Sequence, residues 1–214
     1  MRPFLPLAIL VGSSAAAHAG NTELALGSYN RALRSDSANA VTDDTLVGLS
    51  TGVARRLPLD LFPKLDVWAT GAFVWGSAEG TLFQTMSTTI DSVGFTVGGR
   101  ASYALHRYLR ASARLDLGTA RNELTIHGNG HWVSDAGWGA TATTAVGLDA
   151  LVLAKPQFTI GFRFDLGYIA ATSVALSPRE DGDASKIELD AMQASIGHLD
   201  LGGRFFALSV ISQF

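Results

Sequence analysis

Large apolar and small or polar residues alternate with a period of two along much of this chain. The stretch FTIGFRFDLGYIA, residues 158–170, shows the pattern most clearly. From Phe158 to Tyr168 its even positions are large and apolar, while the odd positions between them are Thr159, Gly161, Arg163, Asp165 and Gly167. Because successive side chains of a strand point to opposite faces, this stretch predicts a strand with one apolar and one polar face. A helix would mix the two sets.

The same alternation recurs often enough to predict eight strands. Their approximate ranges are 23–33, 47–53, 65–75, 93–105, 109–118, 138–149, 158–170 and 199–214. In the last range, the charged Arg204 and Asp200 share the parity of the apolar residues that lead to Phe214. We therefore expect a β-bulge near residues 202–203, which would interrupt the alternation there. The fold class predicted from these patterns is all-β.

The links between the predicted strands alternate in length. Short links fall at 57–64, 106–107 and 151–157, and longer, more polar links fall at 35–44, 77–91, 119–137 and 172–195. This alternation is typical of an antiparallel up-and-down transmembrane β-barrel with short periplasmic turns and longer outer loops. A sandwich with Greek-key connections has no reason to alternate so regularly. Strands of about 10 residues are long enough to cross a bilayer.

The N-terminal segment has the three parts of a secretory signal peptide. Arg2 precedes the apolar run FLPLAILVG, and a small-residue stretch ends in AHAG, so cleavage is expected after Ala19. A membrane anchor is the alternative, but the run is too short to span a bilayer and Pro3 and Pro6 disfavour a helix. The expected domains are therefore a signal peptide, 1–19, and a barrel, 20–214.

Composition narrows the class of protein. Charged residues make up 16% of the chain, against about 25% in ordinary soluble domains. The chain has no cysteine and a formal net charge of -3, which excludes disulfides and argues against a nucleic-acid partner. A soluble lipocalin-type barrel remains an alternative. Its outer face would be polar, whereas the polar set here consists mostly of glycine, alanine, serine and threonine.

The final segment, FFALSVISQF, adds a terminal feature. Phe206, Leu208, Val210 and Phe214 share one parity, and Ser212 departs from the larger side chain usual at its position. With the strand pattern, the chain resembles the small eight-stranded outer-membrane barrels, the class of the OmpA transmembrane domain, OmpX and OmpW. The resemblance implies a bacterial outer-membrane location and contact with outer-membrane lipids and lipopolysaccharide. It also implies recognition of Phe214 by the barrel-assembly machinery, a monomer, and no cofactor.

Charged residues on the polar faces predict a network inside the barrel. A charge facing lipid is costly, whereas charges facing a narrow lumen can pair across it. The predicted members of this lumen ion-pair network are Arg100, Arg110, Arg114, Asp116, Asp149, Arg163, Asp165 and Arg204, with Asp200 as a further candidate. The interior of an eight-stranded barrel is just wide enough for side chains, which favours a structural plug. A narrow, arginine-lined pore for anions is the alternative.

Catalytic chemistry has weak support in the sequence. His127, His131, Ser134 and Asp135 cluster in HGNGHWVSD, but loop spacing fixes no geometry. The His-x-Ser motif of barrel lipid A deacylases is absent. The acidic segment 178–190 fails the EF-hand pattern, because Lys186 stands where glycine is required. We therefore expect no catalytic, cofactor or metal site.

The sequence as a whole predicts an outer-membrane barrel with a structural or surface-interaction role. A narrow pore for small solutes is the first alternative and a lipid-modifying enzyme the second. Two aromatic girdles are expected at the membrane interfaces. The loop-side girdle would hold Trp75, Trp138 and Tyr168, and the turn-side girdle Tyr103, Tyr108, Phe158 and Phe214.

Overall fold

The computed structural model describes residues 21–34, 38, 41–59, 62–82, 85–128, 131–155, 158–176 and 198–214. The predicted signal peptide, 1–19, and the acidic segment, 178–190, lie outside the described residues. No helix among the described residues is long and apolar enough to cross a membrane.

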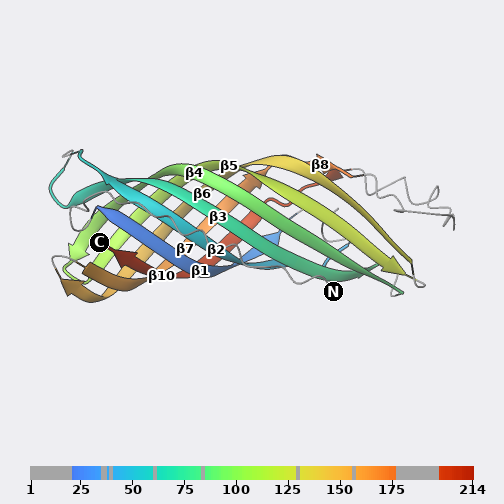
Figure 1. Ribbon diagram of the computed structural model, residues 1–214, viewed down its shortest axis with the longest axis horizontal. Helices are drawn as coiled ribbons and strands as arrows, with labels where there is room; N and C mark the ends of the chain where they lie inside the picture. The colour runs from blue at the N-terminus through green and yellow to red at the C-terminus, as the bar shows by residue number, and fades with distance from the viewer. Residues whose placement is uncertain are drawn as a thin grey trace.

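Eight strands close into one antiparallel barrel. In order around the barrel they are β1, β10, β7, β6, β5, β4, β3 and β2. Their bounds are Thr22–Leu33 (β1), Thr45–Leu57 (β2), Leu65–Leu82 (β3), Met86–His106 (β4), Leu109–Gly128 (β5), His131–Lys155 (β6), Phe158–Ala171 (β7) and Gly203–Gln213 (β10). Figure 1 shows the strands crossing the long axis obliquely, as barrel closure requires. The predicted eight-stranded up-and-down barrel is confirmed.

The two faces of the barrel wall have opposite polarity, as the alternation predicts. On β7, Phe162 and Phe164 are 48% and 44% exposed on the outside, while the intervening Arg163 is 5% exposed inside. The same outward apolar belt continues on every barrel strand, for example at Leu26, Leu49, Phe73, Phe95, Leu117, Val146 and Leu208. Soluble proteins rarely expose so large a contiguous apolar surface. The fold is therefore a transmembrane β-barrel, and the soluble lipocalin-type alternative is wrong.

Two of the predicted long loops are strands. Residues 77–82 and 86–91 form the outer parts of β3 and β4, and residues 119–128 and 131–137 form the outer parts of β5 and β6. The period of two continues there, but the polarity of the faces is reversed. Ile90 and Leu124 are buried inside, while Glu79 and Asp91 are exposed outside. We attribute the reversal to the strands leaving the bilayer, so that their outer face meets water instead of lipid.

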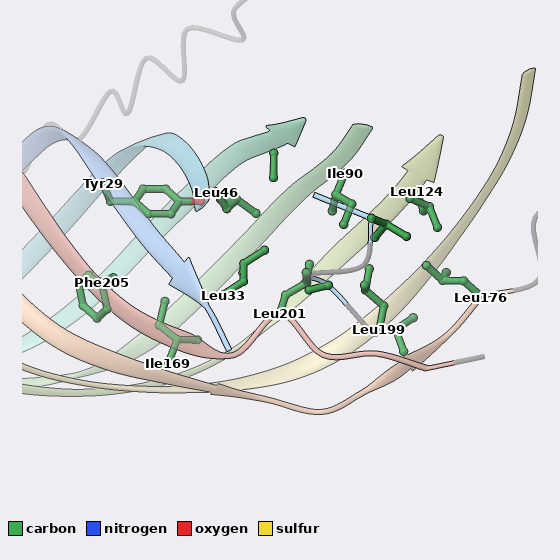
Figure 2. Close-up of a cluster of buried hydrophobic side chains, with 14 of the residues drawn as sticks. Tyr29, Leu33, Leu46, Ile90, Leu124, Ile169, Leu176, Leu199, Leu201 and Phe205 are labelled. Carbon is green, nitrogen blue, oxygen red and sulfur yellow. The ribbon is translucent and has the colours of Figure 1, made fainter. Parts of the chain in front are cut away.

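These strand extensions enclose an apolar cluster at what we call the loop end of the barrel. The opposite end, where β4 turns into β5, is the turn end. Leu33, Leu46, Leu176, Leu199 and Phe205 meet in this cluster (Figure 2). The short strands β8 (Val174–Ala175) and β9 (His198–Leu199) pair with each other and contribute to the cluster. Among the described residues, the loop end thus contains a packed apolar cluster.

Tyr29 lies at the inner boundary of the cluster and depends on two glycines. A Cβ atom at Gly48 would lie 2.7 Å from the Tyr29 ring, and one at Gly76 would lie 2.6 Å from its hydroxyl oxygen. Both distances are shorter than real Cβ contacts, so the ring fits against β2 and β3 only because those positions lack side chains.

The last barrel strand differs from the prediction at its start. β10 begins at Gly203 and pairs with β1 and β7 without a register shift, so the expected bulge at 202–203 is wrong. Residues 200–202 precede the strand, and the Gly202 backbone N–H donates to Asp200 Oδ1 at 2.7 Å. The register shifts that do occur lie at the turn end, between Ala104 and His106 and between Leu151 and Leu153.

Candidate functional site

Glu23 is the centre of a buried charge network in the lumen. It lies near the start of β1, its side chain points inward, and it is 1% exposed. The Arg100 guanidinium donates to both carboxylate oxygens, at 2.6 and 2.8 Å. The Arg163 guanidinium does the same, at 2.7 and 3.0 Å, and Gln213 Nε2 donates at 2.8 Å. One carboxylate therefore accepts five hydrogen bonds from β4, β7 and β10.

A second carboxylate completes the network. Arg163 donates through Nε and Nη2 to the two oxygens of Asp149 on β6, at 2.7 and 2.9 Å. Arg100 packs over the Trp68 ring, with its central carbon 5.1 Å from the ring centroid. Two arginines thus meet two carboxylates with bidentate geometry, which is the strongest arrangement such pairs have. We call Glu23, Arg100, Asp149, Arg163 and Gln213 the Glu23 network.

A smaller group of charges lies farther along the lumen. Arg114 Nε contacts Asp116 Oδ2 at 3.0 Å, and Arg114 Nη1 lies 3.7 Å from Asp165 Oδ2. The Thr70 hydroxyl donates to Asp116 Oδ1 at 2.7 Å. This group carries one positive and two negative charges, so it is less balanced than the Glu23 network.

A cavity of about 100 Å³ lies between the Glu23 network and the apolar cluster. Its wall includes Arg163, Arg114 and Asp165, and it also includes Tyr29 and Phe205 of the cluster. A water molecule needs about 10–15 Å³ of such volume, so the cavity is large enough for several waters. In the described part of the chain, the cavity is lined by both charged and apolar side chains, and Arg31 lines it beside Tyr29.

The structure places six of the eight predicted network residues in these two groups. They are Arg100, Asp149 and Arg163 in the Glu23 network, and Arg114, Asp116 and Asp165 beside it. Arg110 is half-buried, and its Nη1 donates to Gln213 Oε1 at 3.1 Å instead of pairing with a carboxylate. Asp200 caps the Gly202 backbone at the loop end, away from the network.

The prediction that Arg204 belongs to the lumen network is wrong. It is exposed on the outside of β10 and shares its parity with Phe206 and Leu208. The sequence pattern already assigned Phe206 to the lipid face, so only the expected bulge would have turned Arg204 inward. Because β10 is regular from Gly203, that reason disappears.

Glu23 itself was missed. Its parity opposes that of Leu24 and Leu26, which the structure exposes to lipid, so the alternation alone assigns it to the lumen. The predicted network also held five arginines (100, 110, 114, 163, 204) against three aspartates (116, 149, 165), an excess of two positive charges. That excess was a signal that an acidic partner remained to be found.

The register divides the catalytic candidates between the two faces of the β5–β6 hairpin, with His127 and Ser134 on one face and His131 and Asp135 on the other. His127 is exposed on the outer face of β5, opposite Trp132 in the register, whereas His131 is opposite Gly128. On β6, Ser134 and Asp135 have opposite parity, so they belong to opposite faces. Among the described residues, no three His, Cys, Asp or Glu side chains are grouped as metal ligands would be.

No protein-family model and no curated protein matches the sequence. Solved structures similar to the chain include Ail, the attachment invasion locus protein of Yersinia pestis. That protein is 13% identical, with 91% of this chain and 97% of that chain covered and a TM-score of 0.48. The β domain of the Bordetella autotransporter BrkA is 12% identical, with 92% and 99% covered and a TM-score of 0.44. The fold assignment above rests on the strand order and exposed side chains of this chain itself.

Proposed function

We propose that the chain is an integral protein of a bacterial outer membrane whose barrel is closed at both ends. Its role is structural or surface-interacting, and it is neither an enzyme nor an open pore. Export by the signal peptide and residence as a monomer are parts of the same proposal. Its lumen holds ion pairs that stabilise the barrel, and its loop end presents the folded hairpin extensions to the cell exterior.

The Glu23 network is the observation that carries this proposal. Its side chains come from β1, β4, β6, β7 and β10, so they reach across the lumen from five of the eight barrel strands. Glu23, Arg100, Asp149 and Arg163 are each at most 5% exposed. Bidentate pairs of this kind are short and directional, and parting them would leave buried charges without partners. Such a network favours a closed lumen.

A narrow pore is the second candidate, and the cavity between the two closures favours it. The cavity is lined by Arg114, Asp116, Asp165 and several hydroxyl groups. Conduction would require both the Glu23 network and the apolar cluster to open. The pore is therefore the weaker candidate.

An enzyme is the third candidate. The register pairs His131 with Gly128, so the positions of His127 and His131 have opposite parity in the β5–β6 hairpin. A His–Ser–acid set would need His127, Ser134 and Asp135 on one face, and the register separates Asp135 from Ser134. The geometry therefore supports a non-catalytic role better.

Two surfaces of the barrel suggest partners: the C-terminal residue Phe214 and the outward apolar belt. Phe214 closes the seam between the first and last strands, since its backbone exchanges hydrogen bonds of 3.0 and 2.9 Å with Thr22. We propose Phe214 as the contact for the barrel-assembly machinery, and lipids and lipopolysaccharide as the partners of the belt. No nucleic acid and no cofactor is part of the proposal.

The absence of cysteine allows a direct test of membrane placement. Leu208 and Ala207 are neighbours on β10, one 52% exposed on the belt and the other 7% exposed in the lumen. We expect a fluorophore attached to the Leu208→Cys variant to be quenched by brominated lipid tails, and one attached to the Ala207→Cys variant to be protected. Equal quenching of both variants, or release of the protein from membranes by alkaline carbonate, would contradict the proposal.

A further inference from the structure

Arg31 is a buried cation in the wall of the lumen cavity. It is 5% exposed, and among the described residues it has no carboxylate partner. Its Nη1 donates to the Leu201 carbonyl oxygen at 3.0 Å, while its Nε has no hydrogen-bond partner in the described part of the chain. Its guanidinium carbon lies 5.6 Å from the centroid of the Tyr29 ring, and both side chains line the cavity.

Asp165 is a buried anion in the same wall. It is 5% exposed, and its Oδ2 lies 3.7 Å from Arg114 Nη1, which is too far for a hydrogen bond. No donor among the described residues forms a hydrogen bond with its carboxylate. The neighbouring Asp116, by contrast, accepts from the Thr70 hydroxyl at 2.7 Å and contacts Arg114 Nε at 3.0 Å. Because a buried carboxylate without donors is costly, Asp165 favours a ligand that donates hydrogen bonds.

The charges around the cavity are balanced but separated. Apart from Arg163, which belongs to the Glu23 network, the described part of the wall has two arginines and two aspartates. Tyr29 is opposite Ala207, and Ala207 is opposite Asp165, so Asp165 is two strands away from β1. Arg31 is two residues farther toward the loop end, which puts the Cα atoms of Arg31 and Asp165 roughly 10–12 Å apart. Such a wall suits a neutral molecule that has a positive and a negative end of its own.

We propose that the lumen cavity binds one small zwitterion of the size of an α-amino acid. Its carboxylate accepts hydrogen bonds from the Arg31 guanidinium, and its ammonium group donates to the Asp165 carboxylate. The volume of about 100 Å³ is enough for a molecule of a few heavy atoms. An eight-stranded barrel is wide enough to hold one small ligand. The inference goes beyond the structural role proposed above, and it does not require the lumen to conduct.

Equilibrium unfolding in urea, with glycine as the probe and the protein refolded in lipid vesicles, tests the site. Unfolding exposes the lumen, so the equilibrium needs no opening in the folded barrel. Between about 1 and 100 mM glycine, the wild-type midpoint should rise with the logarithm of the concentration once this exceeds Kd. Each tenfold step should add about 0.7 M urea, since tenfold is about 1.4 kcal/mol and the slope is about 2 kcal/mol per molar urea. Acetate and methylammonium, which each supply one end of the zwitterion, should give much smaller rises.

Two variants remove one charge each from the cavity wall. Asp165→Asn and Arg31→Gln should both lose the rise caused by glycine. The matched control is Arg110→Gln, which removes a lumen arginine that donates to Gln213 and lies outside the described wall of the cavity. It should keep the full rise. Each rise is measured against the same variant without glycine, so a change in basal stability does not enter the comparison.

A rise that is linear in glycine concentration and equal in all variants would overturn the site, because it would show exclusion of glycine from the protein surface. The absence of any rise would overturn it too. A full rise with acetate or with methylammonium, or loss of the rise in one variant alone, would show a site for a simple ion and contradict the zwitterion. None of these outcomes depends on the lipid-quenching test of membrane placement.

Discussion

Replacing Glu23 with glutamine tests the lumen network without changing side-chain volume. In the wild type, the Glu23 carboxylate accepts two hydrogen bonds from Arg100, two from Arg163 and one from Gln213. The amide of Glu23→Gln carries no charge and offers one acceptor oxygen. Arg100 would then have no carboxylate partner, and Arg163 would keep only Asp149. Removing one member of a buried ion pair costs about 3–5 kcal/mol, and we expect a loss of free energy of unfolding in that range.

The assay is equilibrium unfolding in urea, with the barrel refolded in lipid vesicles. With a slope of about 2 kcal/mol per molar urea, the midpoint should fall by about 2 M. Glu123→Gln is the matched control, because its ion pair with Arg121 lies outside with side chains 37% and 49% exposed. Surface pairs of this kind are worth about 0–1 kcal/mol, so its midpoint should change little.

A double variant separates charge from packing. Arg100→Met removes the cation that Glu23→Gln leaves without a carboxylate, so the double variant should be less destabilised than the sum of the single variants. If Glu23→Gln were no more destabilising than Glu123→Gln, the reasoning about the network would be refuted. Strict additivity of the two network variants would show that the buried charges act independently.

Three further perturbations test the faces, the apolar closure and the orientation. Arg163→Leu should insert but unfold at lower urea, whereas Phe162→Arg places charge in lipid and should lower the yield of inserted barrel, at a cost of about 2–4 kcal/mol; the reverse outcome would mean that the faces are exchanged. Leu124→Ala in the apolar cluster should cost about 2–5 kcal/mol in the same unfolding assay, and a neutral result would show that the cluster is not a packed core. Protease added to intact cells should cut within 178–190 and spare 57–64, and cleavage at 57–64 alone would reverse the orientation.

The faces of the barrel wall were predictable from the sequence because they depend only on local alternation. Phe162, Arg163 and Phe164 lie as their parity requires, whichever strands become neighbours. The extent of β3 to β6 was not predictable in the same way. Where these strands leave the bilayer, their outer face meets water instead of lipid. The polar side chains therefore point outward there, and apolar side chains such as Ile90 and Leu124 are buried inside. The prediction of long loops at 77–91 and 119–137 assumed that polar side chains always face the lumen, so it did not recognise these strands.

The membership of the lumen network depended on information that alternation does not contain. Parity shows that a side chain points inward, but the strand tilt and register decide which inward residues meet. Glu23 and Arg163 are 140 positions apart and come together only when β10 pairs with both β1 and β7. Arg31 shows the same limit. It is buried inside at 5% exposure, yet its Nη1 donates to the Leu201 carbonyl oxygen at 3.0 Å instead of joining the predicted ion pairs.

We propose that the Glu23 network closes one end of the barrel and the apolar cluster closes the other. Single-channel recording in planar bilayers tests it most directly. The purified wild type, inserted at a density confirmed by labelling, should give no steady conductance steps at neutral pH. Stable, uniform open steps from the wild type would contradict the account, because they would require a continuous path through both closures.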